Sequence, residues 1–188
     1  MKGVFFSSEL PELCEIRDFE IPQPGADEVL VKNAAVASNP KDWKMPMRLQ
    51  WQAIEGNDIA GYIEAVGSKV TGFKKGDKVA AFTKMTTDTK YGAYAEYTVA
   101  PSHTAWHLAD STSFEEAATV PLAMMTAALG LFVHLGLETP STSGSSRRRP
   151  GEIVLIYGAT SSVGAFAVQL ATRAGYSVVG VAGHMPKL

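Results

Sequence analysis

Short runs of apolar and β-branched residues, separated by glycine and proline, characterise the first hundred residues of the chain. Four of these runs predict β-strands: 28–32, 59–66, 78–82 and 94–99. Residues suited to tight turns lie in the gaps, namely Pro22, Pro24, Gly25, Gly67, Gly72, Gly76 and Asp77. Many short strands joined by such turns predict a compact β-barrel or sandwich.

From about residue 113 the apolar spacing becomes helical. Ser113 is suited to cap a helix, and two glutamates follow in the first turn, where negative charge favours the helix dipole. We expect helix over 115–135, in two segments that meet at Pro121. The stretch 117–133 carries no charge, but it is slightly short for a membrane span. We therefore expect a buried helix of a soluble domain.

The last forty residues predict a strand, a helix and a second strand. A stretch rich in Ser, Thr, Pro and Arg, 138–150, precedes them and is typical of an exposed loop. The strand 152–157 is almost wholly apolar, as expected for a parallel sheet covered on both faces. A loop of small residues follows, then a helix over 165–174 and an apolar strand over 177–181. Together they form a complete βαβ unit.

Composition narrows the class of protein. The chain has 188 residues, 46% hydrophobic and 19% charged, with a formal net charge of -2. This is an ordinary globular composition, and the near-zero charge argues against a nucleic-acid-binding surface. Cys14 is the one cysteine, so neither an internal disulfide nor a multi-cysteine zinc site can form. The N-terminus acquires Glu9 and Glu12 before any long apolar run, so we expect no secretion signal and a cytoplasmic location.

Two histidines four residues apart, His103 and His107, have a spacing that suits a metal only on a helix. Pro101 precedes them and Trp106 lies between them, in what reads as strand or turn. We therefore predict no metal there.

The small-residue loop between the strand and the helix has the composition of an anion-binding loop. Free backbone N–H groups and the positive end of a helix dipole point at whatever lies above such a loop. Its residues are Gly158, Ala159, Thr160, Ser161, Ser162, Val163 and Gly164. The strict dinucleotide fingerprint has glycine where Thr160 and Val163 stand, and a small-residue turn also occurs where only packing requires it. The loop alone leaves dinucleotide binding and packing both open.

The end of the second strand bears on the kind of dinucleotide. An NAD site would place Asp or Glu about twenty residues after the first glycine of the loop. Here the region contains Gly183, His184 and Lys187 and no acidic residue. Lys187, helped by His184, could face a 2′-phosphate; the alternative is a polar residue at a frayed terminus.

Several segments in order resemble one enzyme family. Gly56–Gly61 (GNDIAG), Glu64–Gly67 (EAVG) and Phe73–Val79 (FKKGDKV) are followed by 121–128 and the 158–164 loop. This ensemble resembles the medium-chain dehydrogenase/reductases, most closely the quinone oxidoreductases and the fungal trans-acting enoyl reductases of polyketide synthesis. The resemblance covers essentially the whole chain. It implies an α/β protein, with a GroES-like β-barrel domain over 1–120 and a partial Rossmann domain over 121–188 that holds only the first βαβ unit.

The departures from the zinc alcohol dehydrogenases of that family are informative. Where those enzymes place Gly-His-Glu, this chain has Gly56, Asn57 and Asp58, and the region of their first cysteine ligand reads Ala37–Pro40. The cysteine-rich structural loop is absent. The resemblance therefore implies a zinc-free enzyme.

By resemblance, Asn39 is the polar residue beside the nicotinamide and the substrate oxygen. Lys44 stands where quinone oxidoreductases place a tyrosine, and it is either a cation that stabilises an enolate or a surface charge. Thr126 matches a threonine at the nicotinamide end, although a helix threonine that bonds its own backbone would look the same. Lys187 stands where the branch places the lysine that binds the NADPH 2′-phosphate, and Gly183 and His184 belong to the same stretch.

The implied reaction is hydride transfer from NADPH to the β-carbon of an enone or enoyl thioester, or to a quinone. The chain ends just after the second strand, before the remaining units that the family's cofactor domain contains. We therefore expect slow turnover at most, and an exposed sheet edge that allows self-association. The alternative is a catalytically inactive remnant that binds nucleotide weakly or serves as an interaction module. We expect a small-molecule substrate, with no nucleic-acid or membrane partner.

Overall fold

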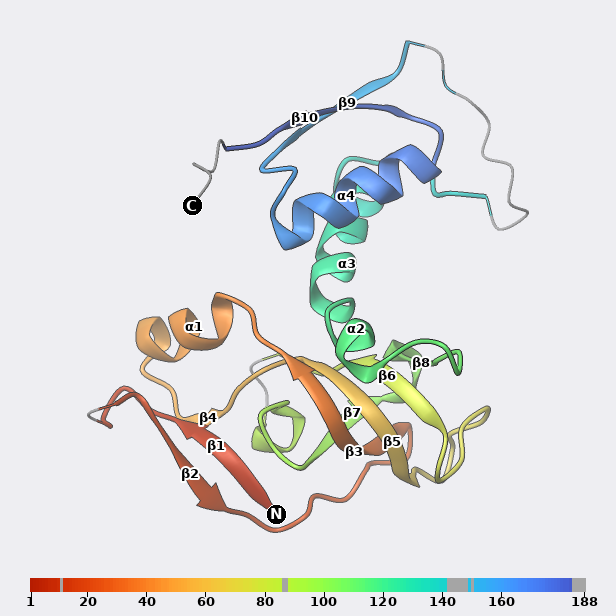
Figure 1. The fold of residues 1–188 in the computed structure, drawn as a ribbon. Helices are drawn as coiled ribbons and strands as arrows, with labels where there is room; N and C mark the ends of the chain where they lie inside the picture. The colour runs from red at the N-terminus through yellow and green to blue at the C-terminus, as the bar shows by residue number, and fades with distance from the viewer. Residues whose placement is uncertain (11, 86–87, 142–148, 150, 184–188) are drawn as a thin grey trace. The chain divides into compact units, whose positions relative to one another are not determined.

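The protein divides into two compact units, Met1–Pro121 and Leu122–Leu188. They are seen in a computed structural model that describes all residues except 11, 86–87, 142–148, 150 and 184–188 (Figure 1). Each unit has its own core, so each is described by itself below.

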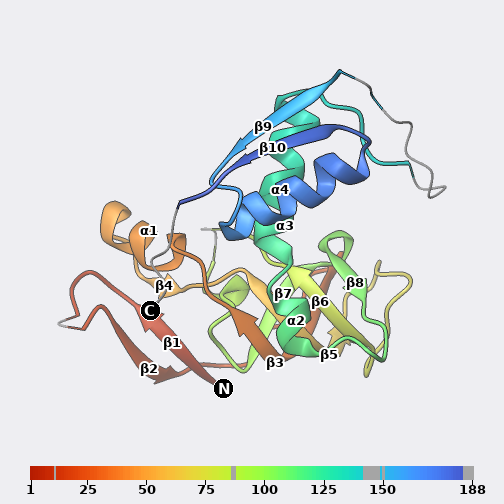
Figure 2. The same cartoon turned by 45° about the horizontal axis from the view of Figure 1, so that its top comes forward.

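The N-terminal unit contains two antiparallel sheets (Figures 1 and 2). The larger sheet has the strand order β7-β3-β5-β6-β8, and the smaller has the order β2-β1-β4. Their bounds are β1 Lys2–Phe6, β2 Cys14–Asp18, β3 Glu28–Ala37, β4 Ala53–Ile54, β5 Asp58–Val66, β6 Lys78–Phe82, β7 Tyr97–Pro101 and β8 Ala105–His107. The longest pairing joins β3 and β5, with register shifts after Leu30 and after Asn33 that bend the two strands.

The main hydrophobic cluster of this unit lies on one face of the larger sheet, and a second cluster, with Ala60 and Ala80, lies on the opposite face under α2. Alternate residues of the paired strands point inward, as the period of two requires. Val29, Val31, Ile59, Ile63 and Val79 are at most 1% exposed. At Gly61 a β-carbon would stand 2.1 Å from the Lys32 carbonyl oxygen, so only glycine allows β3 and β5 to approach this closely.

The predicted strands agree with the observed ones where the apolar pattern is strongest. The run 78–82 is β6, 28–32 is the first half of β3, and 59–66 is β5 without its first residue. The run 94–99 overlaps β7, which begins three residues later and ends at Pro101. The mixed α/β fold class is confirmed. Strands β1, β2, β4 and β8 were not predicted, and neither was α1 (Lys41–Leu49), which contains Pro46.

The helical region has the predicted break at proline. Helix α2 (Phe114–Ala118) begins with a capping box, in which Ser113 and Glu116 bond each other's backbone N–H groups. Helix α3 (Pro121–Ala128) begins at the proline and continues as the π-helical segment η3 (Leu129–His134). An 18-residue window within the run 114–134 has a mean hydropathy of 1.6, and 33% of it is buried. Within the described residues this run alone is long and apolar enough to cross a membrane, a test that core helices also pass.

The C-terminal unit is one βαβ unit. Strands β9 (Ile153–Tyr157) and β10 (Ser177–Val181) pair in parallel, and α4 (Ser162–Arg173) joins them. Helix α4 lies along one face of the two strands (Figure 1). Buried residues from η3, β9, α4 and the turn before β10 form the core: Leu131, Ile156, Ala167, Ala171, Ala174 and Tyr176. The helix begins three residues before the expected position because Ser161 caps it.

The opposite face of the β9–β10 pair corrects one prediction. A wholly apolar strand predicts burial on both faces, but Ile153, Leu155 and Tyr157 are 65%, 67% and 88% exposed. Val179 of β10 is 50% exposed on the same face, opposite Leu155 in the register. The described residues cover only the α4 side of this sheet. Much of the predicted exposed loop, 142–148 and residue 150, lies outside the described residues.

Candidate active site

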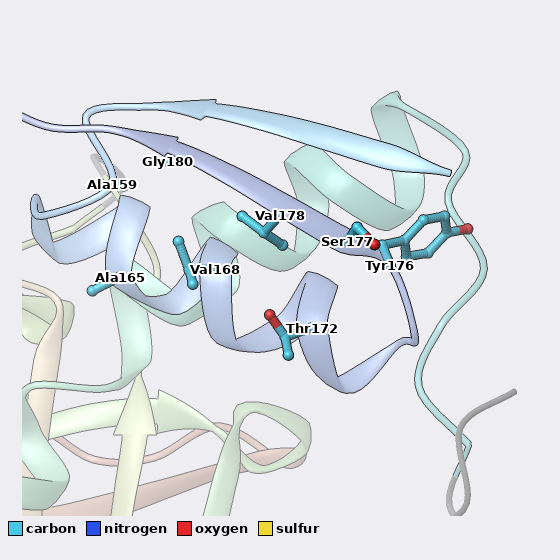
Figure 3. Close-up of a pocket in the computed structure, with 8 residues that line it drawn as sticks. All are labelled: Ala159, Ala165, Val168, Thr172, Tyr176, Ser177, Val178 and Gly180. Carbon is cyan, nitrogen blue, oxygen red and sulfur yellow. The ribbon is translucent and has the colours of Figure 1, made fainter. Parts of the chain in front are cut away.

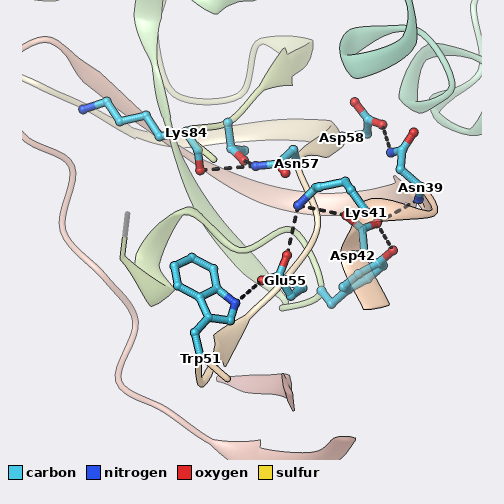
Figure 4. Close-up of polar contacts among 10 residues, drawn as sticks. Asn39, Lys41, Asp42, Trp51, Glu55, Asn57, Asp58 and Lys84 are labelled. Atoms are coloured by element: carbon cyan, nitrogen blue, oxygen red, sulfur yellow. Dashed lines mark hydrogen bonds and ion pairs between the residues drawn. The ribbon is translucent and has the colours of Figure 1, made fainter. Parts of the chain in front are cut away.

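Asn39 is held by two buried carboxylates at the junction between β3 and α1. Its backbone N–H donates to Asp42 Oδ2 at 2.8 Å, and its side-chain Nδ2 donates to Asp58 Oδ2 at 2.6 Å (Figure 4). Asp42 is 3% exposed and Asp58 is 2% exposed, whereas Asn39 is half-buried. Both the backbone and the amide of Asn39 are therefore fixed by charge-assisted hydrogen bonds in a region with little water.

Asp42 also binds a phenol and an ammonium group. Tyr94 donates its hydroxyl proton to Asp42 Oδ2 at 2.7 Å, and Lys41 Nζ lies 2.9 Å from Asp42 Oδ1. Burial raises the pKa of Tyr94 well above its usual value, and the hydrogen bond to Asp42 raises it further. Tyr94 is therefore a neutral donor that organises the carboxylate and does not ionise near neutral pH.

Lys41 connects this carboxylate to a third one. Its Nζ lies 2.9 Å from Glu55 Oε2, and Trp51 Nε1 donates to Glu55 Oε1 at 2.6 Å. The Lys41 side chain is 17% exposed and that of Glu55 is 2% exposed. Buried charges of this kind are tolerated only when they are paired and hydrogen-bonded. One cation thus bridges two buried acids at the edge of the Asn39 site.

Asn57 precedes Asp58 but faces a different neighbour. Its Nδ2 donates to Thr83 Oγ1 at 2.9 Å and to the Lys84 carbonyl oxygen at 3.2 Å. Asn57 is 2% exposed. It therefore ties the start of β5 to the residues after β6, while Asp58 alone of the two meets Asn39 (Figure 4).

A separate charged cluster surrounds Glu28 at the start of β3. Glu28 accepts hydrogen bonds from Tyr91 at 2.5 Å, Lys84 at 2.9 Å, Lys90 at 3.1 Å and the Gly25 N–H at 2.9 Å. Burial acts to raise the pKa of Glu28, but the hydrogen bonds outweigh it and lower the pKa to about 2. These bonds join the start of β3 to the segment around Tyr91 and so stabilise the N-terminal unit.

In the C-terminal unit, the 158–164 loop joins β9 to α4 in a tight turn. Gly158 has φ +80°, and both Gly158 N–H and Ala159 N–H donate to the Val181 carbonyl oxygen, at 2.8 and 2.9 Å. Ser161 caps α4 through the Gly164 N–H at 3.1 Å. A β-carbon on Gly164 would stand 2.1 Å from the Gly158 carbonyl oxygen. Glycine at both positions therefore lets the helix N-terminus close against the strand end.

An open groove of about 770 Å³ lies along α4 and β10 (Figure 3). Its lining is mostly apolar: Ala159, Ala165, Val168, Thr172, Tyr176, Ser177, Val178 and Gly180. The groove lacks charged side chains, so it does not have the chemistry of a phosphate site.

Comparison with known proteins identifies the family. Residues 25–110 match the alcohol dehydrogenase GroES-like domain. The chain is 40% identical over 179 residues to a dehydrogenase of Monascus ruber, covering 88% of this chain and 48% of that protein. It is 39% identical over 172 residues to a trans-enoyl reductase of Gibberella fujikuroi. That match covers 90% of this chain and 50% of the reductase. This chain belongs to the medium-chain dehydrogenase/reductase superfamily.

Solved structures of the superfamily agree. A quinone oxidoreductase of Pseudomonas syringae is 36% identical with a TM-score of 0.70, covering 95% of this chain and 52% of that one. A mycobacterial protein solved in complex with NADPH is 26% identical with a TM-score of 0.71. That match covers 96% of this chain and 51% of the mycobacterial one. The chain spans about half the length of the curated relatives it matches. The superfamily assignment made from the sequence motifs is confirmed.

The site residues expected from this superfamily are distributed over both units. Asn39 lies in the buried polar network. Lys44 is on the exposed side of α1, with its Nζ 5.2 Å from the centre of the Trp43 ring. Thr126 is exposed on α3, and Gly183 is exposed just after β10. His184 and Lys187 lie outside the described residues, so their roles remain predictions.

The two histidines considered for a metal lie in different elements. His103 is in a short 3₁₀ turn and His107 is in β8, where its ring stacks on Phe73 and its Nε2 lies 2.9 Å from the Gly72 carbonyl oxygen. Across the residues that the structure describes, no group of three or more His, Cys, Asp or Glu side chains could hold a metal ion.

Sequence reasoning missed the acids that hold Asn39. The motifs include Asp58, both in Gly56–Gly61 and in the region where the zinc enzymes place Gly-His-Glu, but they do not predict its bond to Asn39, and Asp42 lies in a helix that was not predicted. One signal was available for Asp58, because a charged residue begins a run of six residues, 58–63, that is otherwise apolar, glycine or aromatic. A carboxylate at such a buried position needs a partner.

Proposed function

We propose that this chain carries the substrate-side residues and the first dinucleotide-binding loop of a zinc-independent, NADPH-dependent reductase. Its acceptor is an enone, a quinone or an enoyl thioester. The observation that carries the proposal is the 2.6 Å hydrogen bond between Asn39 and Asp58. These residues lie in the two regions where the zinc enzymes of the family place metal ligands. Here an amide and a carboxylate bond each other, and an amide nitrogen is a hydrogen-bond donor rather than a metal ligand.

The 158–164 loop has the features that a pyrophosphate requires. Its residues are small, α4 is 12 residues long, and the Ser161 hydroxyl lies at the N-terminal end of the helix. Negative charge is favoured at this end of a helix. The mycobacterial relative with bound NADPH supports the choice of cofactor. When bound, NADPH would supply the hydride.

The protein's own contribution would be polar contact with the acceptor oxygen. An oxygen that gains negative charge during reduction is stabilised by hydrogen-bond donors that are already oriented. Asn39 supplies such a donor, and the unsaturated acceptor is electrophilic without a metal. Thr126 is assigned to the nicotinamide end, and Lys187 to the 2′-phosphate with Gly183 and His184 beside it. Lys44 is assigned to the developing enolate. These assignments extend the family pattern to this chain.

The first test is a fluorescence titration of the purified chain with NADPH and with NADH. We expect saturable binding that prefers NADPH and weakens at least tenfold in Lys187→Ala, because one charge-assisted phosphate contact is worth about 1.5 to 3 kcal/mol. Lys69→Ala, an exposed lysine of the other unit, is the matched control. Absence of binding at millimolar cofactor would contradict the proposal. If binding is found, NADPH oxidation with an enone, a quinone and an enoyl thioester identifies the acceptor class.

A second candidate function is an interaction module. The observation in its favour is the exposed apolar face of β9 and β10, because contiguous exposed apolar surface marks association sites. This candidate predicts self-association without turnover. Cytoplasmic location and the lack of nucleic-acid or membrane partners remain predictions.

A further inference from the structure

Asp58 determines which end of the Asn39 amide meets it. A carboxylate only accepts hydrogen bonds, so the amide must turn its Nδ2 donor toward Asp58 Oδ2, as observed at 2.6 Å (Figure 4). One of the two Nδ2 protons is then committed to Asp58. The second proton and the Oδ1 oxygen are the groups with which Asn39 can meet a bound molecule.

We infer that Asp58 is a positioning residue, which sets the orientation of the Asn39 amide for recognition of the substrate oxygen. The inference rests on the proposed function. The two ends of an amide have opposite hydrogen-bonding character, and a 180° turn of the side chain exchanges them. An acceptor oxygen that becomes negative is stabilised by the N–H and repelled by Oδ1. Asp58 fixes one of these two amide orientations before the substrate binds, and such pre-organisation favours catalysis.

The backbone of the same residue is fixed independently. Asp42 accepts the Asn39 N–H at 2.8 Å and belongs to α1, whereas Asp58 begins β5. Asn39 is therefore held from two elements, and Asp42 is itself held by Tyr94 and Lys41. The backbone of Asn39 should therefore stay in place when Asp58 is replaced, while the orientation of its side chain is released.

The principal variant is Asp58→Asn, which keeps the size of the side chain. An amide at position 58 can donate as well as accept, so both orientations of Asn39 become possible. We expect kcat to fall about tenfold or more, the lower range for loss of one oriented donor. We expect the NADPH dissociation constant to stay within about twofold, because in the proposed function the cofactor's phosphates would be held by the 158–164 loop. Asp18→Asn, an 81% exposed acid of β2 that pairs with Lys2, removes the same charge from another element and is the control.

A swapped double variant separates orientation from simple structural support. Asn39→Asp with Asp58→Asn restores an amide–carboxylate hydrogen bond with its direction reversed. We expect Tm to recover toward that of the original chain while kcat stays low, because position 39 then presents a carboxylate to the substrate oxygen. Recovery of kcat together with Tm would show that the pair only supports the fold, and would overturn the inference.

A spectroscopic readout keeps the test decisive whether or not the chain turns over. In two-dimensional 15N–1H NMR, the Asn39 side-chain amide gives a pair of proton signals, and the proton bonded to a carboxylate is displaced. We expect Asp58→Asn to move this pair and Asp18→Asn to leave it in place. If NADPH neither binds nor is oxidised, the proposed function fails, and a displaced pair still identifies Asp58 as the residue that orients Asn39. An unchanged pair, or an active chain whose kcat does not respond to Asp58→Asn, overturns the inference.

Discussion

Tyr91 and Glu28 are 63 positions apart in the sequence, and the tyrosine hydroxyl donates to Glu28 Oε1 at 2.5 Å. Lys84 and Lys90 complete the cluster, so one carboxylate that is 7% exposed connects three segments of the N-terminal unit. The energetic consequence follows from the pKa of Glu28, which falls from an ordinary value of 4.5 to about 2 on folding.

The first prediction concerns the pH dependence of stability. Because the folded pKa of Glu28 is lowered, its contribution is fully present above pH 4.5 and is lost as the pH falls toward 2. Glu28→Gln should reduce the free energy of unfolding by about 2 to 3 kcal/mol at pH 7. Urea unfolding at pH 7 and pH 3 measures this. The variant should differ less from the original chain at pH 3, and an equal difference at both pH values would contradict the assignment.

The second prediction concerns the bridging cation near Asn39. Lys41→Met keeps most of the aliphatic stem but leaves Asp42 and Glu55 without their shared ammonium. Breaking a buried ion pair from one side costs about 3 to 5 kcal/mol, because the remaining charge stays buried. Lys2→Met removes the Lys2–Asp18 pair, whose side chains are 65% and 81% exposed, and should change the unfolding free energy by less than about 1 kcal/mol. Similar losses of unfolding free energy in the two variants would show that the buried network stabilises the fold no more than an exposed ion pair does.

The third prediction concerns the turn between β9 and α4. In Gly164→Ala the new methyl group would meet the Gly158 carbonyl oxygen at 2.1 Å, so the helix N-terminus must move. We expect a loss of about 2 kcal/mol or more in stability, of the order found for overpacking, together with weaker NADPH binding. Gly130→Ala is the control, because no atom lies within 4 Å of its new methyl group and alanine favours helix. If Gly164→Ala kept both its stability and its NADPH binding, the close approach of Gly164 to the Gly158 carbonyl oxygen would not be required.

The fourth prediction concerns the exposed apolar face of β9 and β10. Leu155 is 67% exposed between Ile153 and Tyr157, so Leu155→Lys places a charge in the middle of that face without removing a buried contact. If the face mediates self-association, sedimentation velocity should show the original chain as a dimer or larger species and the variant as a monomer. Val133→Lys, 66% exposed on η3, introduces the same charge on another surface. A monomeric original chain would contradict the interaction-module candidate.

Local pattern was sufficient wherever neighbouring residues decide the structure. Short β-prone runs predicted β6 and most of β5, because each run and its flanking glycines lie within one segment. Ser113, Pro121 and the 158–164 loop likewise act over a few residues, so their caps and turns could be predicted. The motif order identified the superfamily for the same reason, because each motif is continuous in sequence.

Segments with mixed signals required the tertiary structure. Helix α1 contains Pro46 in its interior, a position where proline normally argues against a helix. It forms because its buried side, with Asp42 bonded to Tyr94, packs on the N-terminal unit. Strands β1 and β2 are short and pair with each other at the margin, with Ile16 70% exposed. Their stability comes from partners that are distant in the sequence.

The sequence by itself determined the α/β class, the βαβ unit, its small-residue loop and Asn39 as a candidate residue. Only the tertiary structure decided that Asp58 receives the Asn39 amide, that Lys41 bridges two acids, and that β9 leaves one apolar face exposed. The physical reason is the range of the interactions. Propensity and turn chemistry act between neighbours, whereas the partner of a buried charge is chosen by the folding of the whole unit. In this protein the candidate chemistry depends on the second kind of interaction.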